Sequence, residues 1–338
     1  MKILLVYNSE ILPFERLKCY ASLKKYSEDN VDVLFTLNAH TIKRNLVDKF
    51  FNFIKLPLDK FSINKRIIEK AKENKPYLVF VVKGVNIYPK TLKQLKSMGI
   101  KIVAWSNDDM YVWHNRTFFY TWGLKYYDLV VTQKSYNCNN NELPSLGAKH
   151  VLFQDKSYDP AFHFPSNECA NLSDSYDVIF VGACEQQRLD SIIYLANKGI
   201  EINIFGWGRI MPIDFHPKIV FHNYHLYGED YRRVFTHSKI CLNFLRKINR
   251  DLQTSRSIEI PACRGFMIAE YSIEHARLFI ENTEAVFFHS NEDLYLKVSY
   301  YLQKEIERKT IAENGYNRCI QSGYSFDARM KEILETIK

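Results

Sequence analysis

Two carboxylates, Asp251 and Glu259, stand eight residues apart in the chain. Thr254 or Ser255 can cap a helix that starts between them, which places Glu259 in the first turns of that helix. Pro261 keeps the helix short or kinks it, because a proline inside a helix removes a backbone hydrogen bond. A carboxylate near a helix N-terminus can accept hydrogen bonds from the two hydroxyl groups of a ribose ring. The pair therefore predicts a site for a sugar or a nucleoside.

Three cations, Arg246, Lys247 and Arg250, come just before the first of these acids. They follow a predicted strand that ends near Leu245, and parallel sheets bind their ligands beyond such strand ends. Cations at this place can stabilise a departing nucleotide diphosphate, and contacts that strengthen as the charge develops are catalytic. A solvated basic loop has the same composition, and the sequence leaves both interpretations open.

Glycines mark two further strand ends. Gly182 follows a predicted strand and precedes a helix that carries Arg188. Backbone N–H groups at such a junction can approach a diphosphate closely, and an arginine can neutralise it. Gly206 and Gly208 flank Trp207 at the end of the next strand, where an aromatic ring can pack against a base. A plain turn at Gly182 and a tight strand-to-helix connection at Trp207 are the structural alternatives.

The strongest polar motif of the N-terminal half follows Trp105, where Asp108 and Asp109 come at the end of a predicted strand. Either acid can orient an acceptor hydroxyl or take its proton as a general base. Capping of a helix N-terminus is the structural alternative. A metal site is not expected, since adjacent side chains rarely chelate one cation together. His114 and His163 are interpreted as ordinary structural histidines.

The elements that must position these residues form two series of short apolar strands alternating with helices. Expected strands are 3–7, 31–37, 77–82, 101–105, 129–132 and 150–153, then 178–181, 202–205, 219–221, 240–245, 266–269 and 286–288. Expected helices include 62–74, 89–98, 188–198, 231–236, 291–304 and 306–315. Apolar strands separated by helices predict parallel sheets covered on both faces. This α/β pattern favours two Rossmann-like domains that face one another across a cleft, with ligands beyond the carboxyl ends of the strands.

The C-terminal half resembles the CgeB-like (spore maturation protein) glycosyltransferases of the GT-B superfamily. The spacing of Asp251 and Glu259 is similar to the Glu-x7-Glu signature of retaining nucleotide-sugar glycosyltransferases, with Asp in place of the first Glu. The other matching pieces occur in the family's order: Asp177-Val-Ile-Phe-Val-Gly182, Ile204-Phe-Gly-Trp-Gly208, Ile240-Cys-Leu-Asn243, Arg256-Ser-Ile-Glu-Ile-Pro-Ala-Cys263, Ala285-Val-Phe-Phe-His289 and Ile311-Ala-Glu-Asn-Gly315. In the N-terminal half the resemblance is limited to Trp105-Ser-Asn-Asp-Asp109 and Tyr158-Asp-Pro-Ala-Phe-His163.

For the architecture, the resemblance implies a GT-B fold with three segments. Residues 1–160 would form the acceptor-side domain and residues 161–324 the nucleotide-sugar donor domain. Residues 325–338 would form a helix that crosses back to the first domain. The implied reaction retains the anomeric configuration, with the donor diphosphate assisting proton removal, and requires no metal or other cofactor.

For the site, the resemblance implies that Glu259 binds the donor ribose and that Asp251 lies near hydroxyl groups of the donor sugar. Arg256, which belongs to the same motif, is expected among the donor-binding residues. Gly265 would let the chain approach the nucleotide closely.

The 338 residues are 46% hydrophobic, with 12 Gly and 10 Pro, as expected of a globular chain of two domains. No apolar run approaches the ~18 residues that span a bilayer. Seven cysteines without a Cys-x-x-Cys pair predict reduced thiols, and hence a cytoplasmic protein, and argue against disulfides or zinc. The net charge of +8 is too modest to predict nucleic-acid binding.

Residues 43–75 hold ten Lys or Arg against four acids, with phenylalanines between them. The members at issue are Lys43, Arg44, Lys49, Phe50, Phe51, Phe53, Lys55, Lys60, Lys65 and Arg66. One interpretation is a helical face with solvated lysines over a normal core stripe. The other is a surface for anionic lipid headgroups or a phosphorylated acceptor, which implies a peripheral place at the inner face of the membrane.

These features predict a cytoplasmic glycosyltransferase that moves a sugar from a nucleotide-sugar donor to an acceptor. The sequence does not identify the acceptor, whether a glycan, a lipid-linked molecule or a protein. The rival hypothesis is a nucleotide- or sugar-binding module without turnover, or a degenerate partner of another transferase. Release of free nucleotide from the donor distinguishes the two, because a transferase slowly hydrolyses its own donor and a binding module does not.

Overall fold

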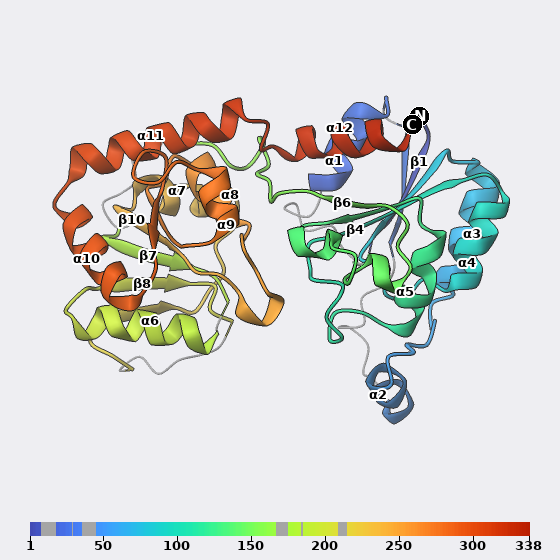
Figure 1. The fold of residues 1–338 in the computed structure, drawn as a ribbon, viewed down its shortest axis with the longest axis horizontal. Coiled ribbons are helices and arrows are strands. Elements are labelled where there is room, and N and C mark those ends of the chain that lie inside the picture. Colours follow the sequence, from blue (N-terminus) through green and yellow to red (C-terminus); the bar gives the residue numbers. More distant parts are fainter. Residues whose placement is uncertain (8–17, 29, 36–44, 167–174, 184, 209–214) are drawn as a thin grey trace. The chain divides into compact units, whose positions relative to one another are not determined.

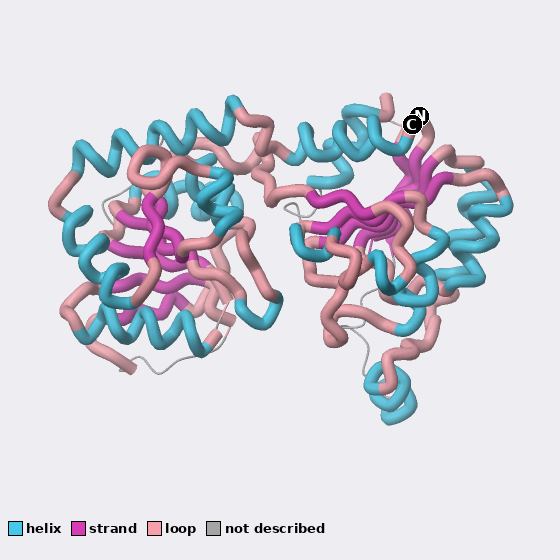
Figure 2. The backbone as a smooth tube through the Cα atoms, viewed as in Figure 1, coloured by secondary structure: helices cyan, strands magenta, loops and turns pink. Residues whose placement is uncertain are grey.

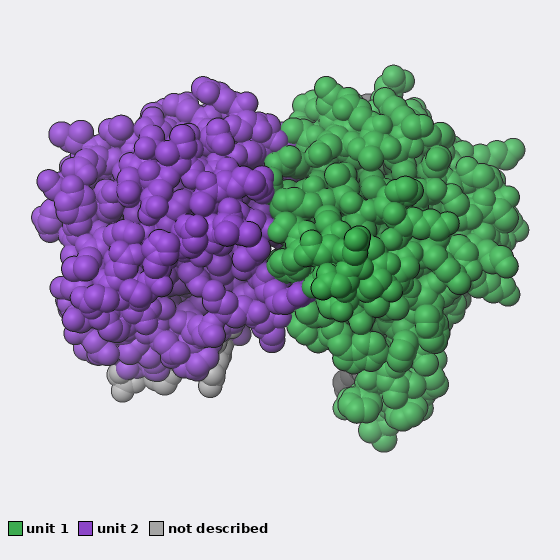
Figure 3. All heavy atoms as spheres, in the orientation of Figure 1, with its two compact units in different colours: residues 1–155, 327–338 green, residues 156–326 purple. Residues whose placement is uncertain are grey.

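The fold is described from a computed structural model, which covers residues 1–7, 18–28, 30–35, 45–166, 175–183, 185–208 and 215–338. The chain divides into two compact units (Figure 3). Unit 1 comprises Met1–Asp155 and Asp327–Lys338, and unit 2 comprises Lys156–Phe326. The boundaries expected from the sequence lie within five residues of these, at 160 and 324.

Unit 1 is built on a six-stranded parallel sheet in the order β2-β1-β3-β4-β5-β6. Its strands are β1 (Ile3–Tyr7), β2 (Val31–Phe35), β3 (Leu78–Val82), β4 (Lys101–Ser106), β5 (Leu129–Thr132) and β6 (Val151–Phe153). Its helices are α1 (Lys18–Tyr26), α2 (Leu46–Phe53), α3 (Ile63–Asn74), α4 (Pro89–Ser97), α5 (Phe118–Gly123) and α12 (Phe326–Ile337) (Figures 1 and 2). The central strands are apolar along their whole length because helices cover both faces of the sheet.

Unit 2 repeats this plan with a sheet in the order β12-β11-β10-β7-β8-β9, again wholly parallel. Its strands are β7 (Val178–Val181), β8 (Ile202–Phe205), β9 (Ile219–His222), β10 (Ile240–Asn243), β11 (Met267–Glu270) and β12 (Val286–Phe288). Its helices are α6 (Gln186–Asn197), α7 (Gly228–His237), α8 (Arg256–Ala262), α9 (Ile273–Leu278), α10 (Asn291–Leu302) and α11 (Glu305–Gln321).

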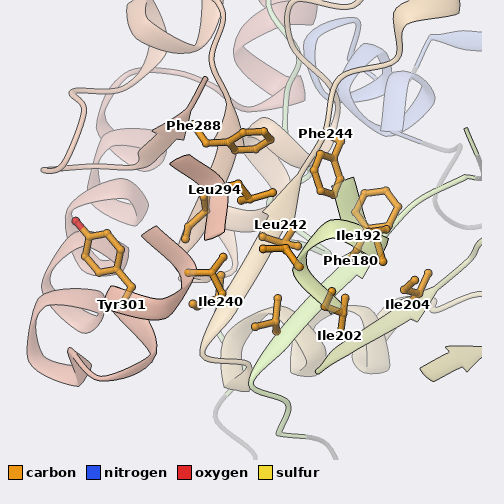
Figure 4. Close-up of a cluster of buried hydrophobic side chains, with 14 of the residues drawn as sticks. Phe180, Ile192, Ile202, Ile204, Ile240, Leu242, Phe244, Phe288, Leu294 and Tyr301 are labelled. Atoms are coloured by element: carbon orange, nitrogen blue, oxygen red, sulfur yellow. The ribbon is translucent and has the colours of Figure 1, made fainter. Parts of the chain in front are cut away.

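The core of unit 2 lies in two layers, one on each face of this sheet. Along β7, Val178 and Phe180 pack into one layer and Ile179 and Val181 into the other, because successive strand residues point to opposite faces. Helices α6 and α10 cover the first layer, with Ile192, Leu294 and Tyr301 among its members (Figure 4), and α7, α8 and α9 cover the second. Helix α11 contributes Ile311 to the first layer and Cys319 to the second. The sheet is therefore a rigid platform whose strand ends position the loops that follow them.

The C-terminal helix α12 belongs to unit 1. Asp327, in its first turn, accepts hydrogen bonds from Ser22 Oγ (2.7 Å) and from Lys25 of α1. Gln154, at the end of β6, donates through Nε2 to the carbonyl of Arg329 (2.9 Å). These contacts hold the first turn of α12 against α1 and the end of β6.

The structure confirms the predicted fold class of two Rossmann-like α/β units with parallel sheets. The largest difference in the elements is α11, which was expected to end at Gly315 and continues to Gln321. Gly315 does not end the helix, because its role is close packing: a Cβ there would lie 2.4 Å from the carbonyl oxygen of Glu284. A glycine needed for helix packing has the same sequence signal as a helix-ending glycine.

Candidate functional site

The loops after β7 and β10, which carry several of the sequence motifs of unit 2, lie at the carboxyl edge of its sheet. The chain runs from β7 to β8 and β9 on one side, and then returns to place β10 on the other side of β7. The loops after β7 and β10 therefore leave neighbouring strand ends in opposite directions. Open α/β sheets bind their ligands outside such a switch point. Here the switch point is flanked by residues 182–183 and 185–188 after β7 and by residues 244–256 after β10.

Arg188 is the buried cation at this switch point. It lies in the first turn of α6, where Nη1 donates to the carbonyl of Ala183 (3.0 Å) and Nη2 to that of Phe244 (3.1 Å). The side chain thus joins the loop after β7 to the loop after β10. Its Nε is buried without a hydrogen-bond partner among the described residues, so one donor of the guanidinium is unused.

A second guanidinium, that of Arg256 at the start of α8, lies at the same edge. Its Nε donates to the carbonyl of Val181, the last residue of β7 (3.2 Å). Burial lowers the pKa of Arg188 to about 10; the charge of Glu185 opposes this shift, and those of Arg256 and Arg246 add to it. Three arginines are therefore close enough to influence one another, and Glu185 lies beside them at the same edge.

Arg246 and Lys247 extend from the loop after β10 to carboxylates on either side of it. Arg246 Nε lies 2.7 Å from Glu185 Oε1, and Lys247 forms an ion pair with Glu270 at the end of β11. The two cationic side chains are 44% and 51% exposed, so the loop is solvated and also tied to the edge. Arg250 contributes the left-handed backbone turn (φ +46°) that returns the chain to the edge.

Asp251 is a buried carboxylate within this cationic surrounding. Its backbone N–H donates to the carbonyl of Arg246 (2.9 Å), and its Oδ1 accepts from Asn249 Nδ2 (2.9 Å). Its charge is the smallest of the influences that raise the pKa of Arg188, so the acid lies within electrostatic range of that guanidinium group. The sequence motif thus brings an acid and three arginines to one strand edge.

Glu259 lies on α8, one turn after Arg256, and is also buried. Its Oε2 accepts a hydrogen bond from Tyr231 Oη (2.6 Å), and its Oε1 lies 3.7 Å from His163 Nε2. His163 Nδ1 accepts the backbone N–H of Asp159 (2.9 Å), so the neutral imidazole carries its proton on Nε2, facing the carboxylate. Burial, followed by the charge of Glu259, raises the pKa of Tyr231 well above its usual value.

The structure corrects the expectation that Trp207 packs against a base. Its ring is buried in the core beside Phe180 and Phe221, with ring centroids 6.0 and 5.9 Å away. Gly206 has φ +69°, so the turn after β8 is the tight connection that was the structural alternative. At Gly182 a Cβ would lie 2.7 Å from the ring of Phe180, so packing alone requires glycine there.

The expectation that Gly265 approaches the nucleotide is also wrong in this fold. Gly265 immediately precedes β11, so it lies at the amino end of that strand, opposite the carboxyl edge. A Cβ at this position would lie 2.9 Å from the carbonyl oxygen of Phe235, which explains the glycine by packing against α7. The neighbouring Arg264 is exposed and pairs with Glu313 at the same end (2.9 Å).

Sequence reasoning missed a buried polar network that fixes the loop carrying Asp251. Ser257 Oγ accepts hydrogen bonds from Asn243 Nδ2 (3.0 Å) and from the N–H of Thr254 (2.9 Å). It donates to His275 Nε2 (2.7 Å), since His275 Nδ1 must donate to the carbonyl of Glu270 (2.7 Å). The network joins β10, β11 and the start of α8. Its signal in the sequence was weak, because single polar residues after strands are common.

The buried His275 makes a testable contribution to stability. Burial lowers its pKa to about 4, whereas an unfolded histidine titrates near 6.5. Between these values the unfolded state binds the proton first, so the free energy of unfolding should fall by about 3 kcal/mol as the pH drops through this window. His275→Gln should remove this part of the fall, which denaturant titrations at pH 7 and pH 4.5 measure. Equal falls in the wild type and the variant would contradict the assignment.

In unit 1 the two adjacent acids differ in role. Asp109 is fully buried; its Oδ1 accepts from the N–H of Tyr111 and from Asn137 Nδ2, both at 3.0 Å. Asp108 is half-buried and lies 2.7 Å from Lys83 Nζ. Neither acid caps a helix, since α5 begins nine residues later with Thr117 as its cap. Asp109 thus holds the loop after β4, and Asp108 is the acid with access to solvent.

The two helices of the basic stretch 43–75 differ in how far their apolar residues are buried. Residues 43 and 44 lie outside the described part of the chain. In α3 the apolar residues Ile63, Ile67 and Ala71 are buried, as a core stripe predicts. In α2 Leu46, Val47, Phe50 and Phe53 are exposed and only Phe51 is partly buried, so the core-stripe interpretation does not hold there. Among the described residues, no helix is long and apolar enough to cross a membrane, and no cluster of His, Cys, Asp or Glu is arranged to hold a metal.

Comparison with known proteins agrees with this architecture. Residues 188–335 match a family model described as "Glycosyl transferase-like". The whole chain is similar to the structure of Anabaena HepE in complex with UDP, at 13% identity, TM-score 0.65 and 99% coverage of both chains. The present chain has the GT-B fold. A glycosyltransferase from Rickettsia africae (13% identity, TM-score 0.66, 100% and 98% coverage) and a Thermosynechococcus elongatus sucrose-phosphate synthase (10%, 0.66, 99% and 99%) share this GT-B fold. The comparison with curated proteins gave no match.

Proposed function

We propose that this protein is a glycosyltransferase that moves a sugar from a nucleotide-sugar donor to an acceptor. The family match over residues 188–335 and the GT-B fold support the class. The single observation that carries the proposal is the buried carboxylate Asp251 among Arg188, Arg246 and Arg256 at the switch point of unit 2. A nucleotide sugar offers a diphosphate to the arginines and sugar hydroxyls to the acid.

Unit 2 would be the donor unit, with each residue in a definite role. Arg188 and Arg256, whose guanidinium groups lie at the strand ends of β10 and β7, would hold the diphosphate. Arg246 and Lys247, which are tied to the edge and solvated, would gain contacts as the leaving group becomes more negative. Asp251 would accept from donor-sugar hydroxyls. These cations supply the charge neutralisation that a metal supplies elsewhere, so the proposed reaction requires no metal.

Glu259 would accept both hydroxyls of the donor ribose, with Tyr231 and His163 fixing its orientation. HepE structures contain UDP and UDP-glucose, which makes uridine nucleotides the first donors to test. Within the glycosyltransferases we place the chain with the CgeB-like members on the motifs of its C-terminal half. We also propose retention of the anomeric configuration, with the departing diphosphate taking the proton of the acceptor hydroxyl.

A nucleotide-binding module without turnover shares the same arginines, and the experiment must separate the two. Thermal shift and calorimetry with UDP, GDP, CDP and dTDP identify the base that binds. Incubation with the corresponding nucleotide sugars then measures the release of free nucleotide. Binding without release would support the module and contradict the transferase.

Unit 1 would be the acceptor side, and its acids give a paired prediction. Asp108→Asn is expected to reduce sugar transfer about 100-fold while donor hydrolysis and nucleotide affinity stay unchanged, because Asp108 would orient the acceptor hydroxyl and a misplaced reactant costs about 10²-fold. Asp109→Asn should instead lower the unfolding temperature, since Asp109 accepts two hydrogen bonds in a fully buried loop. Parallel loss of transfer, hydrolysis and affinity in Asp108→Asn would show that Asp108 is structural too.

A further inference from the structure

Helix α2 of unit 1 exposes apolar side chains that a soluble surface ordinarily buries. Leu46 and Phe53 are 82% and 83% exposed, and Val47 and Phe50 are more than half exposed. The helix protrudes from the rest of unit 1 (Figure 1). Large apolar residues grouped on one short helix mark an interaction surface, whereas single exposed ones do not.

The helix is well formed, so this exposure is not that of a frayed segment. Asn45 caps α2 with a complete capping box, in which Asn45 Oδ1 accepts from the N–H of Asp48 (2.8 Å) and Asp48 Oδ2 from that of Asn45 (3.1 Å). Asp48 is buried and also pairs with Lys60, which fixes one side of the helix on the following segment. The opposite, apolar side is held outward.

A second exposed aromatic group lies beside the end of α2. Lys55 accepts a hydrogen bond on its carbonyl from the N–H of Phe118 (3.1 Å) and donates through Nζ to the carbonyl of His114 (3.2 Å). The Phe118 ring stacks on that of Trp122 and meets the edge of Trp113, with centroids 5.2 and 5.1 Å away. Both tryptophans are about half exposed. Tryptophan is the residue most typical of a membrane–water interface.

The charges around these side chains indicate what kind of partner surface would bind them. In the described stretch 45–62 the two acids are engaged inside the unit: Asp48 with Lys60, and Asp59 with the N–H groups that begin α3. Lys49 is exposed on α2, and Lys55 lies at its end. The outward charge is therefore positive, which is complementary to acidic lipid headgroups.

We propose that α2, with Trp113 and Trp122, is a docking surface for an anionic lipid bilayer. The apolar side chains would enter the headgroup region while Lys49 and Lys55 contact the headgroups. Unit 1 would thereby be held at the membrane surface. The proposal does not depend on the transferase assignment, because it concerns lipid binding by residues of unit 1, whereas the donor assignment concerns residues of unit 2.

Vesicle sedimentation of the whole protein tests this proposal. Wild type should bind vesicles of phosphatidylcholine mixed with phosphatidylglycerol at low salt, and bind them much less at high salt or with phosphatidylcholine alone, because headgroup attraction is screened within about 8 Å at physiological ionic strength. The double variant Leu46→Ser/Phe53→Ser should lower the partition coefficient at least about tenfold.

Ile306→Ser is the matched control, since Ile306 on α11 of unit 2 is as exposed as Phe53, at 83%. It should bind vesicles like the wild type, and all variants should keep the wild-type unfolding temperature. No binding to anionic vesicles at low salt would overturn the proposal. So would concentration-dependent dimerisation in sedimentation velocity that the double variant abolishes, because the apolar face would then belong to a second copy.

Discussion

Arg246→Gln is expected to lower kcat/KM for donor hydrolysis about 10- to 100-fold. A hydrogen bond to a charged group is worth about 1.5–3 kcal/mol, and this one would strengthen as the diphosphate departs. The side chain is 44% exposed and has a single carboxylate partner, Glu185, so the substitution should leave the fold intact. Steady-state kinetics with the preferred donor measure the effect. A change confined to KM would mean that Arg246 binds the donor equally in the ground state and the transition state, which would contradict a contact that strengthens as the diphosphate departs.

Arg264→Gln is the control for this experiment. Arg264 is also 44% exposed and also pairs with one carboxylate, Glu313 at 2.9 Å. It lies at the opposite edge of the same sheet, so its loss should leave hydrolysis within about twofold of the wild type. Equal losses in the two variants would show that the effect of Arg246 is a general consequence of removing charge.

Glu259→Gln is expected to weaken nucleotide binding by roughly tenfold or more, because the ribose would lose charge-assisted hydrogen bonds worth about 1.5–3 kcal/mol each. Glutamine keeps an oxygen to accept the bond from Tyr231, whereas Glu259→Ala would leave that buried hydroxyl without a partner. Calorimetry with the preferred nucleotide measures the change. An unchanged Kd at unchanged stability would contradict the ribose assignment.

Glu142→Gln tests whether substitution of any buried glutamate would weaken nucleotide binding. Glu142 is buried in unit 1, where its Oε2 accepts from Asn137 Nδ2 (3.1 Å). The substitution should lower stability without changing the Kd for nucleotide. Comparable losses of affinity in both variants would point to a general effect on folding.

Much of the fold was predictable because its signals are local. Strands such as Ile3–Tyr7 and Val178–Val181 are buried on both faces and are therefore apolar at nearly every position. Such a run can be recognised in the sequence without knowledge of tertiary contacts. The cations after β10 were predictable for the same reason, since a strand end fixes the edge at which they lie. The structure shows a second role for two of the predicted donor-binding cations. Arg188 and Arg256 also donate hydrogen bonds to backbone carbonyls and so hold the strand ends together.

The sequence was less informative where a residue's role depends on packing between distant segments. Trp207 and Gly265 have the composition of ligand-binding turns, yet Phe180 and Phe221 enclose the tryptophan and α7 crowds the glycine. The partnership of Ser257 with His275 joins residues 18 positions apart through the sheet. No period or spacing encodes such a contact.

Release of free nucleotide from nucleotide sugars tests the central claim most directly. The account predicts that the wild-type protein liberates nucleoside diphosphate from at least one donor, with uridine donors first, and that Arg246→Gln slows this release while Arg264→Gln does not. Tight binding of a nucleotide sugar with no release of nucleotide, or release at equal rates from the wild type and Arg246→Gln, would contradict it.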